Sequence, residues 1–202
     1  MRARSAARKQ SRACVLVGGQ CYHGLLMIDP LPTVPLPSSQ KPLYISVIGG
    51  GRSTAEHYAQ AEEVGRLVAG MGAVLVCGGL AGSMEAAARG AKEAGGLTVG
   101  ILPGLDRSLA NPYIDIAITT GMGHARNLAV VGSGDGVIAV GGEFGTLSEI
   151  GLAGKIGRPV VILSGWRVSQ EEGTHGVWYA SSPKEAVALL REALGLRSTP
   201  AY

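Results

Sequence analysis

The chain has 202 residues, of which 46% are apolar and only 4% aromatic, and glycine alone contributes 32. This composition supports a sizeable core of small aliphatic side chains and excludes collagen-like and low-complexity sequences. The formal net charge of +3 comes from basic residues within the first 12 positions. The remainder is close to neutral, so the sequence lacks the basic face that nucleic-acid binding requires.

Cysteine content and hydropathy argue against a disulfide-rich, metal-binding or membrane-spanning protein. Cys14, Cys21 and Cys77 are odd in number and lack CxxC spacing, so neither a disulfide framework nor a metal site is predicted. No apolar run reaches the ~18 residues of a membrane span. We therefore expect a cytoplasmic protein without a membrane or nucleic-acid partner.

The first 42 residues are expected to form a disordered or extended, proline-rich tail, since they show no convincing alternating strand pattern. Its basic, serine-rich start suits a disordered extension or a misassigned start codon, with a targeting segment as the alternative. Residues 30–42 contain five prolines and two serines, a composition typical of an extended linker. The sequence thus predicts a single folded domain over residues 43–197, followed by a short tail at 198–202.

Strand and helix signals alternate along that domain. Apolar runs predict strands at 44–48, 73–76, 97–102, 114–118, 137–140 and 159–163. Helical spacing predicts helices between them. The first starts at a capping box, Ser53 to Glu56. Another runs over 124–131, and another starts at Thr146. The last is capped by Ser182 and has Pro183 at its first position. Repeated strand–turn–helix units indicate an α/β fold, a Rossmann-like doubly wound parallel sheet.

Three glycine-rich turns fall where strands end, the edge at which such sheets bind ligands. They contain Gly49, Gly50 and Gly51; Gly78, Gly79 and Gly82; and Gly142, Glu143, Phe144, Gly145 and Thr146. Unobstructed backbone N–H groups at a helix start favour a phosphate. The first of these turns is not in GxGxxG register, and a plain tight turn explains it equally well.

The segment 141–149 is the most specific feature, because a buried strand ends in glycines directly before a helix. It lacks the Gly-Lys-Ser/Thr of a Walker sequence. Glu149 lies three residues after Thr146, which is also the spacing of a capping box. A functional carboxylate and a helix cap therefore both remain open for Glu149.

Together these motifs resemble the Lonely Guy (LOG) family, once described as lysine decarboxylases. The resemblance rests on residues 78–85, Gly95-Gly96, the segment 100–103 and the Gly-x-x-Gly-Thr-x-x-Glu pattern at 142–149. Residues 111–113 and 123–127 are most similar to the branch that includes molybdenum cofactor carrier proteins. The match spans about residues 43 to 195.

This resemblance implies hydrolysis of the N-glycosidic bond of nucleoside 5′-monophosphates, with Arg126 and Glu149 as the catalytic pair. Such cleavage builds oxocarbenium character that a carboxylate can stabilise. Three positions depart from the LOG pattern: Asn127 replaces a lysine, Gly141 a proline and Glu143 a glycine.

These departures favour a binding protein over an enzyme. The first hypothesis is a cofactor carrier or binder of a phosphorylated, nucleotide-like small molecule, either a nucleoside monophosphate or the molybdenum cofactor, with no further cofactor required. The alternative is a nucleoside 5′-monophosphate phosphoribohydrolase. The resemblance, with helices rich in alanine and glycine, also leads us to expect a homodimer or larger homo-oligomer.

Overall fold

The computed structural model describes residues 15–17, 20–22, 41–169 and 176–196. The chain divides into two compact units, Met1–Gln40 and Lys41–Tyr202.

The first unit contains a two-stranded antiparallel pairing. In it β1 (Val15–Val17) pairs with β2 (Gln20–Tyr22), with Val17 opposite Gln20. These six residues form strands. The expectation of a disordered or extended tail over residues 1–42 stays a prediction, because most of that segment lies outside the described residues.

The second unit is built on a seven-stranded parallel sheet with the order β6-β5-β4-β3-β7-β8-β9. Its strands are β3 (Tyr44–Gly49), β4 (Val74–Cys77), β5 (Thr98–Leu102), β6 (Ile116–Thr119), β7 (Gly136–Val140), β8 (Val160–Ser164) and β9 (Val177–Tyr179). The chain moves outward from β3 to β6 and then returns to place β7 beside β3. The strand order thus reverses between β3 and β7, the position at which open α/β sheets bind ligands.

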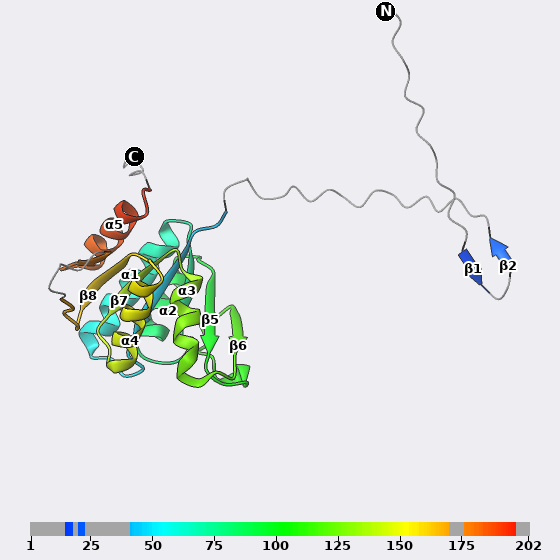
Figure 1. The fold of residues 1–202 in the computed structure, drawn as a ribbon, viewed down its shortest axis with the longest axis horizontal. Coiled ribbons are helices and arrows are strands. Elements are labelled where there is room, and N and C mark those ends of the chain that lie inside the picture. The colour runs from blue at the N-terminus through cyan, green and yellow to red at the C-terminus, as the bar shows by residue number, and fades with distance from the viewer. Residues whose placement is uncertain (1–14, 18–19, 23–40, 170–175, 197–202) are drawn as a thin grey trace, which may run out of the picture. The chain divides into compact units, whose positions relative to one another are not determined.

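Helices cover both faces of this sheet, as predicted (Figure 1). They are α1 (Ala55–Gly70), α2 (Ser83–Glu93), α3 (Asn127–Ser133), α4 (Phe144–Lys155) and α5 (Pro183–Ala193), with short 3-10 turns at Arg107–Leu109 and Gly123–Arg126. Successive side chains of a strand point to opposite faces of the sheet, so the sheet separates two hydrophobic cores. In β7, Ile138 packs with residues of α1, α2 and α5, whereas Val137 and Ala139 pack with residues of α3 and α4.

Helix starts differ from the predicted ones in three places. The N-cap of α1 is Thr54, whose hydroxyl accepts from the His57 N–H over 3.1 Å, so Ser53 does not cap. Helix α4 begins at Phe144, before the predicted Thr146. The helix predicted over 124–131 is a 3-10 turn followed by α3. The cap of α5 by Ser182 is confirmed.

In the second unit, the strands match the predicted ones apart from their ends and one addition. The fourth predicted strand, 114–118, is observed as Ile116–Thr119. Strand β9 was not predicted, because three residues are too few to show an alternating pattern.

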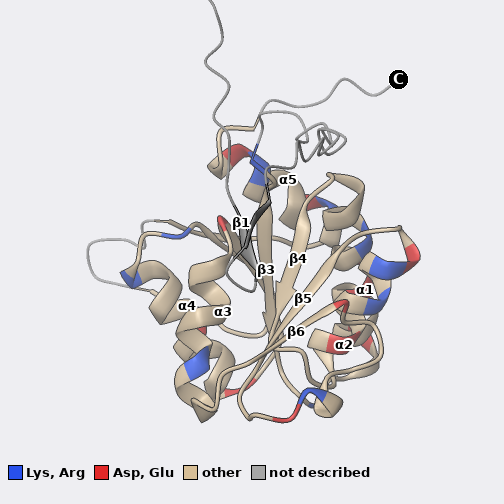
Figure 2. Ribbon diagram, turned by 90° about the vertical axis from the view of Figure 1, so that its right-hand side faces the viewer, with Lys and Arg blue, Asp and Glu red and all other residues tan. Residues whose placement is uncertain are grey.

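Charged residues of both signs lie on α1 and α2 (Figure 2). Arg66 pairs with Glu62 and Glu93, and Arg89 pairs with Glu62, which joins the outer faces of the two helices. Exposed pairs of this kind add little stability individually. Among the residues that the structure describes, no helix is long and apolar enough to cross a bilayer.

Candidate functional site

The three glycine-rich turns meet at the carboxyl ends of the central strands. Gly49 and Val140 are partners in the register of β3 and β7. A Cβ on Gly50 would lie 3.3 Å from Cα of Gly142, so the first and third turns are in contact. The second turn joins them, because the Ser83 N–H donates to the Gly50 carbonyl over 3.0 Å.

Two serines reinforce this junction. The hydroxyls of Ser53 and Ser83 share a hydrogen bond of 2.7 Å, which links the start of α1 to the start of α2. Ser83 Oγ also donates to the Val140 carbonyl over 3.4 Å. Neither serine was predicted as a site residue, although Ser83 directly follows the Gly78–Gly82 turn and so carried a positional signal.

The third turn leads into the N-terminus of α4. Gly142 has φ +97°, a conformation that strongly favours glycine, and its Cβ would collide with the side chain of Thr146. Glu143 is the N-cap residue and forms no side-chain hydrogen bond to the helix. The first N–H groups of a helix have no acceptor within it, and its dipole attracts anions. The turn therefore presents the groups that a phosphate requires.

The other predicted glycines line or support this junction. Gly51 is exposed, and a Cβ on it would meet no atom within 4 Å. Gly82 is the N-cap of α2, at φ 72°. Gly79 has a structural role, because its Cβ would lie 3.1 Å from Cα of Gly100 in β5.

Arg126 and Glu149 form a buried ion pair beside the turns. Arg126 ends the 3-10 turn before α3, and Glu149 lies in the middle of α4. Their side chains are 10% and 7% exposed, with 3.6 Å between Nη1 and Oε1. The reading of Glu149 as the capping partner of Thr146 is therefore wrong, because the N-cap is Glu143.

The Arg126 guanidinium is held against the second turn. A Cβ on Gly78 would lie 2.6 Å from Nη2, so any side chain there would displace it. Nη1 donates to Oδ1 of Asn127 over 2.7 Å. Nε is buried and finds no hydrogen-bond partner among the described residues. Asn127, which departs from the LOG lysine, thus orients the arginine.

Burial controls the charges of this pair. Loss of solvent raises the pKa of Glu149 to about 7, against the opposing effect of Arg126. Burial also lowers the pKa of Arg126, which the Glu149 carboxylate opposes. Glu149 can therefore hold or release a proton near neutral pH, as a general acid or base must.

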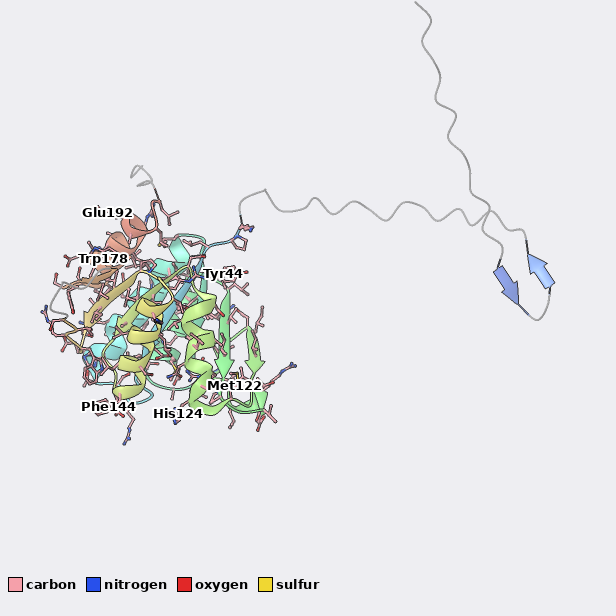
Figure 3. The ribbon with its side chains drawn as sticks, in the orientation of Figure 1. Tyr44, Met122, His124, Phe144, Trp178 and Glu192 are labelled. Atoms are coloured by element: carbon pink, nitrogen blue, oxygen red, sulfur yellow. The ribbon has the colours of Figure 1, made fainter. Side chains whose placement is uncertain are left out.

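Two predicted residues lie at the rim. Glu143 is exposed, and Phe144 is 78% exposed. Figure 3 shows Phe144 at the same end of the sheet as Met122 and His124, with Tyr44 toward the opposite end. Trp166, two residues beyond β8, was missed. The rule that strand ends form the site could have found it, because β8 ends at the same edge as β7.

Known proteins share this fold over most of its length. A molybdenum cofactor binding protein from the phototrophic bacterium Rippkaea orientalis is similar with a TM-score of 0.73 and 42% identity, covering 77% of this chain and 99% of that one. The molybdenum cofactor carrier protein of Chlamydomonas reinhardtii is similar with a TM-score of 0.69 and 34% identity, at the same coverage.

A curated enzyme is a more distant relative. The cytokinin riboside 5′-monophosphate phosphoribohydrolase of Mycobacterium tuberculosis is 35% identical over 121 residues, which are 55% of this chain and 65% of that protein. These similarities confirm the resemblance to the LOG proteins and their carrier branch. The SLOG cluster4 family matches residues 42–187. The chain therefore belongs to the SLOG cluster4 family.

Proposed function

We propose that the protein binds a phosphorylated, nucleotide-like small molecule, of the class of the molybdenum cofactor or a nucleoside monophosphate, and serves as its carrier. The observation that carries this proposal is the junction of three glycine-rich turns at the first turn of α4, where Glu143 leaves the helix without a side-chain cap. The similarity to a cofactor binding protein and a carrier protein supports it.

The residues present fit a phosphorylated pterin or nucleotide as cargo. The backbone at Gly142, Gly145 and Thr146 would hold the phosphate, and the turns at 49–51 and 78–82 would line the site. The unpartnered Nε of buried Arg126 is a further donor suited to an anion.

Glu143 is compatible with a bound phosphate. Its backbone carbonyl accepts a hydrogen bond from Trp166 Nε1 over 3.2 Å, and the residue is exposed to solvent. Repulsion from an exposed carboxylate is weakened by water and salt. The exposure of Glu143 therefore supports the proposal despite the departure from the LOG glycine at this position.

Calorimetric titration with inorganic phosphate, GMP and guanosine tests the proposal. GMP should bind, phosphate should compete with it, and guanosine should bind at least ~10-fold more weakly because it lacks the group that the α4 N-terminus holds. Equal affinity for GMP and guanosine, or no binding of either phosphorylated probe, would contradict the proposal.

A second candidate, a phosphoribohydrolase, is favoured by the buried Arg126–Glu149 pair and by the Mycobacterium relative. The Glu149 carboxylate would stabilise the oxocarbenium-like ribose while Arg126 held the phosphate or the carboxylate. Base release from a panel of nucleoside monophosphates tests this. Turnover that falls ~100-fold in Glu149→Gln would establish the enzyme, and no turnover by the wild-type protein would exclude these substrates.

We also propose a homodimer or larger homo-oligomer. The support is the family resemblance, together with helices whose small side chains bury little area each. Light scattering at micromolar concentration should give at least twice the monomer mass, and a 20.6 kDa species would contradict it.

A further inference from the structure

An aromatic pair stands at the rim of the phosphate-binding turns. Phe144 is the first residue of α4 and is 78% exposed. Its ring centroid lies 5.5 Å from that of half-buried Trp166, with the planes tilted by 50°. The Phe144 ring therefore lies at the surface directly beside the turn that would hold a phosphate, and partly buried Trp166, which also packs against the core on the α3 and α4 side of the sheet, supports it.

The backbone fixes this pair to the turn. Trp166 Nε1 donates to the Glu143 carbonyl over 3.2 Å. The Gly141 N–H donates to the backbone carbonyl of Ser164 over 3.0 Å and lies 3.1 Å from its hydroxyl oxygen. The end of β8 and the residues just after it are thus attached to the 141–143 turn at two points, Ser164 and Trp166, and the position of Trp166 relative to that turn is set by the fold.

We propose that Phe144 and Trp166 form a platform on which the planar heteroaromatic ring of the ligand, a pterin or a purine, stacks while its phosphate lies at the α4 N-terminus. This inference rests on the proposed function and adds the part of the ligand that is recognised besides phosphate. Aromatic side chains bind such rings through their faces, with modest sequence or ring preference. A guanine and a pterin share the same fused pyrimidinone, so GMP is a suitable probe.

Tryptophan fluorescence can test the platform, because a ring stacked on Phe144 and Trp166 should quench the Trp166 emission. The chain has two tryptophans, and Trp178 lies in β9, well away from Phe144 in Figure 3. In Trp178→Phe, Trp166 is the only tryptophan that remains. GMP should quench its emission at the concentrations that saturate binding in calorimetry. Ribose 5-phosphate should leave the emission unchanged and bind ~10-fold more weakly, because it lacks the ring.

A matched pair of variants tests Phe144. Phe144→Leu keeps an apolar side chain but removes the ring, and it should lower GMP affinity ~10-fold while affinity for ribose 5-phosphate stays the same. Tyr44→Leu makes the same exchange at a 37% exposed aromatic residue toward the opposite end of the domain. It should bind both probes as the wild-type protein does.

Different failures separate the two proposals. Equal affinity for GMP and ribose 5-phosphate, with no quenching, would overturn the platform and leave the phosphate site standing. No binding of either probe would overturn the proposed function and the platform with it. If Phe144→Leu lowers the mass seen by light scattering but not GMP affinity, the aromatic pair packs against a second copy of the chain, which also overturns the platform.

Discussion

Gly65 of α1 lies directly against the backbone of Ala87 in α2. A Cβ on Gly65 would lie within 2.8 Å of the Ala87 carbonyl carbon, so the two helices touch through their main chains. Overpacking at such a contact costs about 1–3 kcal/mol. Gly65→Ala should lower the free energy of unfolding by this amount in urea denaturation.

The control for this change is Gly154→Ala in α4. Gly154 is exposed, and an added Cβ would meet no atom within 4 Å. Alanine is the better helix former, so the free energy of unfolding of this variant should rise by up to ~1 kcal/mol. Equal effects of the two substitutions would show that helix propensity, not the α1–α2 contact, decides both.

Glu149→Gln should change how stability depends on pH. The folded-state pKa of Glu149, about 7, lies above its ordinary value of 4.5. The folded state therefore keeps a proton that the unfolded state releases, and the wild-type protein loses stability as pH rises from 4.5 to 7, on the order of 2–3 kcal/mol. Glutamine lacks this titration. The free energy of unfolding of the variant should therefore rise relative to that of the wild-type protein between pH 4.5 and 7, as measured by urea denaturation at each pH.

Glu192→Gln serves as the control for this titration, because Glu192 is an exposed glutamate of α5. It should follow the wild-type protein at every pH. A constant difference between Glu149→Gln and wild type from pH 4.5 to 8 would show that Glu149 does not titrate in this range.

Gly142→Val should abolish binding of GMP and phosphate. The valine Cβ would collide with Thr146, and φ +97° is strained for any branched residue. Gly151→Ala, about two helical turns into α4, adds a Cβ into open space and should bind normally. Circular dichroism confirms folding of both. Undiminished GMP affinity in folded Gly142→Val would place the phosphate elsewhere.

Thr54 and Ser53 should separate a helix cap from a site residue. Thr54→Ala removes the bond to the His57 N–H and should cost about 1 kcal/mol of stability. Ser53→Ala removes the bond to Ser83. It should weaken GMP binding and leave the melting temperature nearly unchanged. The reverse pattern would restore Ser53 as the cap of α1.

The sequence predicted the parallel sheet except for β9, and the place of the turns, because most of the strands are apolar, β-branched runs and three of them end in glycines. It could not predict the contact between Arg126 and Glu149. They are 23 positions apart, and only the packing of α4 beside α3 makes them neighbours. Arg126 had been identified by resemblance to a motif, whereas its burial and its bond to Asn127 required the structure.

Local signals also misplaced the helix starts. Ser53 and Thr54 are equally good caps by residue type. A tertiary contact decides which of them caps α1, because the Ser53 hydroxyl is hydrogen-bonded to Ser83 of α2. Thr146 was predicted to start a helix, but Gly142 already turns the chain and allows α4 to begin at Phe144. Trp166 was missed because only the glycine-rich strand ends were taken as site candidates, and its bond to the Glu143 carbonyl required the structure.

The bonds that join the three turns have a kinetic consequence. The Ser53–Ser83 hydrogen bond and the Ser83–Gly50 backbone bond hold the first two turns together, and the bond from Ser83 Oγ to the Val140 carbonyl links them to the strand end before the third. Their ordering entropy is thus lost during folding, before any ligand arrives. Association with a phosphorylated ligand should then be a single step, with an observed rate that rises linearly with ligand concentration and no plateau from a slow rearrangement.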